Sequence, residues 1–131
     1  MKITYHDLIC QTFCFPQEGF DLQDGHLIFH GVSISRLIKI HGTPFKLTYL
    51  PRIQEQVNKA RGYFNRAMKK HGYAGSYQYC YCTKTCHFKH VIEAALKEGV
   101  HLETSSAFDI DLIVRLAEEG KFPKDRYVIH N

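Results

Sequence analysis

Apolar side chains recur at steps of three and four residues along three segments of the chain, which is the spacing of one face of an amphipathic helix. The longest segment begins at Pro51, a residue suited to the first turn of a helix. Its predicted buried stripe comprises Ile53, Val57, Ala60, Phe64, Ala67 and His71. The other two helices are predicted over Phe88–Leu96 and after a cap at Ser106. A shorter helix is expected between the cap Ser33 and the stop Gly42.

Short runs of apolar and aromatic residues lie between these helices and predict strands. The predicted strands are Leu27–His30, Phe45–Leu50, Tyr77–Thr83, Val100–Thr104 and Arg126–His130. Residues 1–25 show no sustained period and are expected to be irregular. From Phe45 on, strands and helices alternate, which is typical of parallel strands joined by helical crossovers. The predicted fold class is α/β, in two parts that a break at Gly42–Pro44 separates: residues 1–44 and residues 45–131.

Composition, charge and hydropathy exclude several classes of protein but do not indicate a function. The chain has 131 residues, of which 44% are hydrophobic and 23% charged, and this balance excludes an intrinsically disordered chain. The net charge of +4 comes from scattered cations without a long run, so no nucleic-acid partner is expected. No segment approaches the roughly 18 apolar residues of a membrane span. The polar start at Met1–Asp7 does not resemble a secretory signal, and we expect a cytoplasmic protein without a membrane partner.

Three of the five cysteines are close together, at Cys80, Cys82 and Cys86, with His87 beside the last. In a protein without a secretory signal, reduced thiols are more common than disulfides. The spacing is not the paired C-x-x-C arrangement of zinc sites. A zinc module therefore remains only an alternative, and no metal ligands are predicted. Neither a glycine-rich dinucleotide loop nor a phosphate-binding Walker loop follows any of the predicted strands.

The segment from Tyr77 to Lys84 carries the most informative chemistry. Side chains alternate across a strand, so Lys84 ends a face whose other members are Cys80, Cys82 and Gln78. In parallel α/β folds, ligands and catalytic groups gather at the carboxyl ends of the strands. A lysine there is suited to form an imine with an aldehyde cofactor. The alternative interpretation is an ordinary exposed lysine at the start of a loop.

Four segments, in this order along the chain, resemble motifs of the biosynthetic arginine decarboxylases. This family belongs to the alanine-racemase-like, fold-type III decarboxylases that depend on pyridoxal 5'-phosphate (PLP). The segments are Gly42–Phe45, Tyr79–Lys84, Leu102–Asp109 and Arg126–Asn131. The resemblance extends from about Tyr5 to Asn131 and thus covers nearly the whole chain.

The resemblance implies a lyase that converts arginine to agmatine and CO2 in polyamine (spermidine) biosynthesis. It further implies that PLP attaches to Lys84, that Glu103 and Ser106 lie close to the cofactor, and that Mg²⁺ is a possible second cofactor. The implied fold is the beginning of a PLP-binding (β/α)8 TIM-type barrel over residues 45–131. By the same resemblance, residues 1–44 are expected to form a segment that packs with a carboxyl-terminal β-domain.

The family enzyme is a homo-oligomer. Its barrel has eight strands, whereas this chain supplies three strands of the kind that carries Lys84. We therefore expect an amino-terminal fragment of a longer enzyme that is inactive by itself. Two further alternatives stay open. One is a decarboxylase acting on ornithine, lysine or diaminopimelate, and the other is a non-catalytic binding homologue similar to the antizyme inhibitors.

Overall fold

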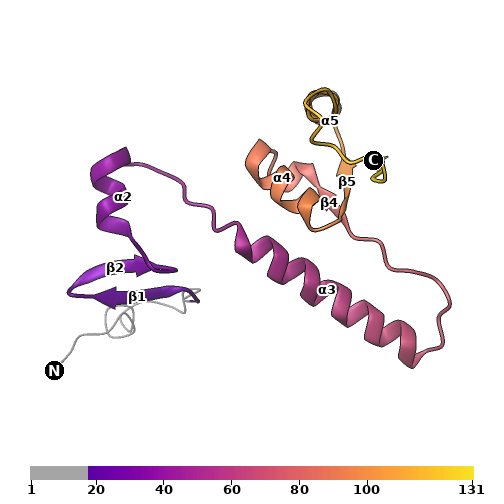
Figure 1. Cartoon of the computed structure of the whole chain (residues 1–131), viewed down its shortest axis with the longest axis horizontal. Helices are drawn as coiled ribbons and strands as arrows, with labels where there is room; N and C mark the ends of the chain where they lie inside the picture. The colour runs from indigo at the N-terminus through magenta and orange to yellow at the C-terminus, as the bar shows by residue number, and fades with distance from the viewer. Residues whose placement is uncertain (1–17) are drawn as a thin grey trace. The chain divides into compact units, whose positions relative to one another are not determined.

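The computed structural model describes residues 18–131, which belong to two compact units. One unit ends at Leu47 and the other comprises Thr48–Asn131 (Figure 1). The fold of the described part is mixed α/β, with α-helices and two small sheets, which agrees with the predicted class. None of the helices in the described part is long and apolar enough to cross a membrane.

The first unit contains an antiparallel sheet of three short strands, β1 (Phe20–Gln23), β2 (His26–Phe29) and β3 (Val32–Ser33). Strand β2 matches the predicted strand, but β1 lies in the segment expected to be irregular, and that expectation is wrong for these residues. The turn between β1 and β2 is Asp24–Gly25, whose two residues have positive φ values of 49° and 76°. Asp-Gly between alternating apolar residues is a strong hairpin signal that could have indicated β1. Residues 1–17 lie outside the described part.

The predicted short helix is confirmed as α2 (Ile34–His41). The Ser33 hydroxyl caps it by accepting a hydrogen bond from the backbone N–H of Arg36 at 3.3 Å. Gly42 ends it with a φ of 73°, a left-handed value that favours glycine, and donates its N–H to the Ile38 carbonyl.

The strand predicted over Phe45–Leu50 does not form, and this segment is irregular in the structure. Its apolar and polar residues do alternate, but no described strand pairs with it. A strand is stable only where its backbone groups bond to a neighbouring strand. Leu47, an apolar member of the pattern, is 43% exposed.

The second unit is built on a parallel three-stranded sheet in the order β4 (Cys80–Cys82), β5 (His101–Thr104) and β6 (Val128–His130). Helix α3 (Pro51–Lys70) precedes it, and α4 (Lys89–Lys97) and α5 (Ala107–Glu118) form the two crossovers. Tyr81, Leu102 and Val128 stand in register across the three strands. The predicted parallel pairing through helical crossovers is thus confirmed for these strands.

The main core lies between this sheet and helices α4 and α5. Its buried members are Ile92, Leu96, Leu102, Ile113 and Leu116. A second cluster joins α3 to the unit through Val57, Ala95 and Val100. The predicted apolar stripe of α3 is buried only in its first half, because Phe64 and Ala67 in the second half are exposed. Phe64 stacks on Tyr77 instead, with ring centroids 4.0 Å apart.

A buried histidine, His101, lies at the first position of β5. Its Nε2 is 3.0 Å from Gln78 Oε1, which has no proton to give, so Nε2 donates. Its Nδ1 accepts the backbone N–H of Tyr127 at 3.4 Å, and the two rings stack with centroids 3.6 Å apart. Both contacts suit the neutral imidazole. Burial, and then the positive charge of Arg126, lower the pKa of His101 below its ordinary 6.5.

We expect the folded state to lose stability as the pH falls below about 6.5, because the unfolded chain then takes up a proton that folded His101 resists. The contribution of neutral His101 to the free energy of unfolding is fully present above that pH and declines as the pH falls toward the lower pKa of the folded state. Urea unfolding at several pH values between about 7.5 and 5 measures this pH dependence. A His101→Gln variant should show a flatter dependence, and an equally steep one would contradict the assignment.

Candidate cofactor site

Lys84 lies directly after the carboxyl end of β4, in the short 3-10 helix η1 (Thr83–Thr85). The strand predicted over Tyr77–Thr83 is shorter than expected, because β4 pairs with β5 only at Cys80–Cys82. The Thr85 hydroxyl then donates to the Cys82 carbonyl at 2.8 Å and closes the turn. The Lys84 side chain is exposed and forms no ion pair with any described residue. Its amine is therefore accessible at the edge where the parallel strands end.

A hollow of about 680 Å³ opens beside Lys84 at this edge of the sheet. It is bounded by η1 and the residues after it on one side, and by the β5–α5 loop and the first turns of α5 on the other. The lining residues are Lys84, His87, Ser105, Ser106, Phe108, Asp109 and Leu112. The structure thus brings two of the predicted site residues, Lys84 and Ser106, to one hollow.

Ser106 caps helix α5 together with Asp109. The Ser106 hydroxyl accepts the Asp109 N–H at 3.3 Å and donates to Asp109 Oδ2 at 2.9 Å. The N–H of Ser105 donates to the same carboxylate at 3.1 Å. This backbone bond is the main reason why the pKa of Asp109 lies below its ordinary value although burial acts in the opposite direction. The predicted helix-start pattern is confirmed, and Ser106 keeps one lone pair that could accept a hydrogen bond from a ligand.

Glu103, the third predicted site residue, is not among the residues that line this hollow. It lies in β5 in register with Cys82 on one side and Ile129 on the other. Its neighbour Leu102 points into the core, so alternation places Glu103 on the opposite face of the sheet. Its Oε1 accepts a hydrogen bond from Asn131 Nδ2 at 3.3 Å.

The cysteines of this region are half-buried free thiols. Burial, and then the charge of Glu103, raise the pKa of Cys80, which makes its thiolate form rarer at neutral pH. Cys82 shares the Glu103 face by register. Among the residues that the structure describes, no three His, Cys, Asp or Glu side chains are grouped as metal ligands.

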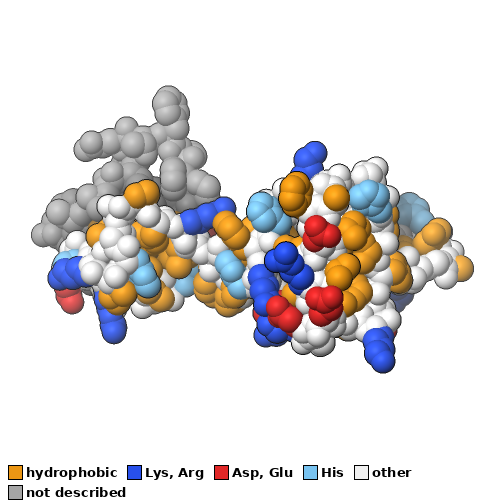
Figure 2. Space-filling model, turned by 90° about the horizontal axis from the view of Figure 1, so that it is seen from above, with side chains coloured by type: hydrophobic (Ala, Val, Ile, Leu, Met, Phe, Trp, Pro, Cys, Tyr) orange, Lys and Arg blue, Asp and Glu red, His pale blue; other side chains and the backbone are white. Residues whose placement is uncertain are grey.

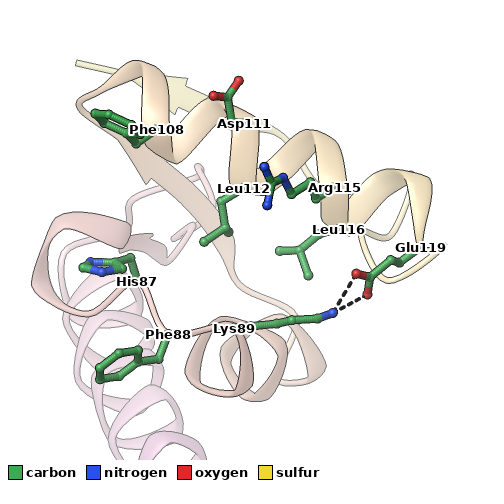
Figure 3. Close-up of a pocket in the computed structure, with 9 residues that line it drawn as sticks. All are labelled: His87, Phe88, Lys89, Phe108, Asp111, Leu112, Arg115, Leu116 and Glu119. Carbon is green, nitrogen blue, oxygen red and sulfur yellow. Dashed lines mark hydrogen bonds and ion pairs between the residues drawn. The ribbon is translucent and has the colours of Figure 1, made fainter.

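A groove of about 510 Å³ continues from this hollow between the start of α4 and helix α5 (Figure 3). His87, Phe108 and Leu112 line both cavities, so the two are contiguous. At the far end Lys89 and Glu119 form an ion pair with a distance of 2.6 Å between Nζ and Oε2. On the surface shown in Figure 2, apolar side chains lie beside acidic and basic ones.

Two further residues contribute to the geometry of the hollow without having been predicted as site residues. His87 comes from the segment between η1 and α4, and nothing in its spacing singles it out. Thr83 is completely buried directly before Lys84. The alternation of side chains along the predicted strand does place Thr83 on the face of Tyr81, which packs against the core.

Comparison with known proteins adds no assignment to this geometry. The chain matches no model of a known protein family, and a search of curated proteins finds no significant match.

Proposed function

We propose that the chain is the amino-terminal part of a PLP-dependent amino-acid decarboxylase, with Lys84 as the residue to which the cofactor attaches. One observation carries the proposal: an accessible lysine follows the first strand of a parallel sheet and lines a hollow at the carboxyl edge. Catalytic groups of parallel α/β proteins gather at this edge. In this proposal β4, β5 and β6 are the first strands of a (β/α)8 barrel.

The residues present fit a cofactor of this kind. The hollow of about 680 Å³ has the size of known small-molecule sites. Ser106 can accept one hydrogen bond there, and His87 supplies a further polar side chain. PLP, when bound, supplies an electron sink for the loss of an α-carboxylate as CO2.

What the chain itself must supply is an amine that can lose its proton, since only the neutral form is a nucleophile. The other lysines near the groove are less suitable. Lys89 is paired with Glu119, and the hydrogen bonds that Lys121 donates to Glu93 and then to Glu119 raise the pKa of Lys121. Lys84 forms no ion pair with a described residue, so its amine is the accessible one beside the hollow.

Arginine is the proposed substrate, and agmatine and CO2 are the products. This choice is supported by the resemblance of Gly42–Phe45, Tyr79–Lys84, Leu102–Asp109 and Arg126–Asn131 to the arginine decarboxylases. The resemblance implies that Glu103 lies close to the cofactor, but Glu103 is on the opposite face of the sheet and outside the hollow, so no contact with PLP there is proposed for it. Homo-oligomerisation of the complete enzyme is part of the same proposal.

The proposal is tested with the polypeptide encoded by the complete reading frame. After addition of PLP and reduction with borohydride, peptide mass mapping should find the cofactor on Lys84, and the unreduced protein should release ¹⁴CO2 from carboxyl-labelled arginine. Release from ornithine, lysine or diaminopimelate in place of arginine would change the substrate only. A protein that neither carries PLP on Lys84 nor decarboxylates any of these amino acids would contradict the proposed function.

A further inference from the structure

The residue directly before Lys84 is buried and hydrogen-bonded to the neighbouring strand. Thr83 has no exposed surface, and its hydroxyl donates to the Glu103 carbonyl of β5 at 3.0 Å. A hydroxyl has one proton, and in Thr83 the Glu103 carbonyl accepts it. The turn that carries Lys84 is thus fixed to β5 at its first residue.

Asp109 holds the β5–α5 loop on the other side of the hollow. It is 8% exposed and accepts from the Ser105 N–H and from the Ser106 hydroxyl, both in this loop. A cap of helix α5 alone needs only the reciprocal bonds with Ser106. The additional bond from the Ser105 N–H fixes the residue that directly follows β5.

We propose that Thr83 and Asp109 are positioning residues for Lys84. Thr83 fixes the turn that bears Lys84 to β5, and Asp109 fixes the β5–α5 loop on the other side of the hollow. This inference rests on the proposed function, because it concerns the lysine to which PLP is proposed to attach. Thr83 does not line the hollow, and Asp109 is assigned this role through the loop groups that it binds. Lys84 itself has a long, flexible side chain, so its backbone is the part that Thr83 can hold in place.

The physical reason is the cost of a misplaced reacting group. An amine held in one orientation reacts faster than one that samples many orientations, because the loss of entropy that orders it has already occurred during folding. Thr83 and Asp109 are buried, so water cannot replace their hydrogen bonds when one partner is removed. Loss of the Thr83 hydroxyl should therefore loosen η1 while the core beneath the sheet remains intact.

The test compares Thr83→Val, which removes the hydroxyl and keeps the shape, with Thr83→Ser, which keeps the hydroxyl. Each variant is made in the complete polypeptide, incubated with PLP, reduced with borohydride after short times, and digested for mass mapping. The readout is the initial rate of modification at Lys84 divided by that at Lys97, an exposed lysine at the end of α4. We expect Thr83→Val to lower this ratio about fivefold and Thr83→Ser to restore it.

Asp109→Asn provides a second variant should Thr83→Val unfold, and Asp111→Asn on the same helix is its matched control. Asp109→Asn should lower the ratio and Asp111→Asn should not. An unchanged ratio in both Thr83→Val and Asp109→Asn would overturn the positioning role, as would a loss confined to variants whose thermal unfolding shows a disrupted fold. A wild-type chain in which Lys84 reacts no faster than Lys97 would contradict the proposed function itself.

Discussion

Replacing Lys84 by alanine in the complete polypeptide should reduce release of CO2 from arginine to about one thousandth of the wild-type rate or less, as expected when a covalent attachment point is lost. PLP should no longer be fixed by borohydride at this position. The fold should be unaffected, because the Lys84 side chain is exposed and forms no ion pair with a described residue. Thermal unfolding therefore should change by no more than about 0.5 kcal/mol.

Two matched variants show whether the effect depends on the amine at this position. Lys84→Arg keeps the positive charge but cannot become a neutral nucleophile, so it should be as inactive as Lys84→Ala. Lys97→Ala removes a lysine at the end of α4, outside the hollow, and should keep normal turnover. Normal turnover in Lys84→Ala would refute the assignment. A complete polypeptide that binds another decarboxylase at fixed stoichiometry, without activity of its own, would favour the non-catalytic homologue.

The elements that the sequence predicted well are those whose signals are local. Helix α2 begins at the serine cap and ends before the glycine that the pattern indicates, and α3 begins at Pro51. The order of strand and helix from Tyr77 onward sufficed to predict parallel pairing. The segment Phe45–Leu50 has the same alternation as a strand, but its state depends on a pairing partner. Sequence periodicity contains no information about that partner.

The candidate site was predictable to a similar extent. The position of Lys84 at the carboxyl edge follows from the end of one strand and the parallel order of its neighbours. Its closeness to Ser106 follows from the same order, because both residues come directly after adjacent strands. The alternation of side chains along β5 also predicts that Glu103 lies on the face of the sheet opposite to Leu102. The hydrogen bond from Thr83 to the Glu103 carbonyl was not predictable, since it depends on how the ends of two strands lie relative to each other.

Leu102→Ala should destabilise the chain by about 3 kcal/mol, the largest loss that we expect from a single substitution in its core. Leu102 has no exposed surface and belongs to β5, the middle strand of the parallel sheet. It packs in the cluster formed with residues of both crossover helices. Truncation to alanine leaves a cavity that strands fixed on either side by hydrogen bonds cannot close.

The size of this effect tests the claim that the sheet and helices α4 and α5 form one cooperative core. A domain of this size is stable by only about 5–15 kcal/mol, so the Leu102→Ala midpoint in urea should fall sharply while the slope of the transition stays the same. Val114→Ala is the matched control, because Val114 is also an apolar residue of this unit but is 48% exposed. It should cost less than about 1 kcal/mol. Equal losses in the two variants would mean that Leu102 does not lie at the centre of a packed core.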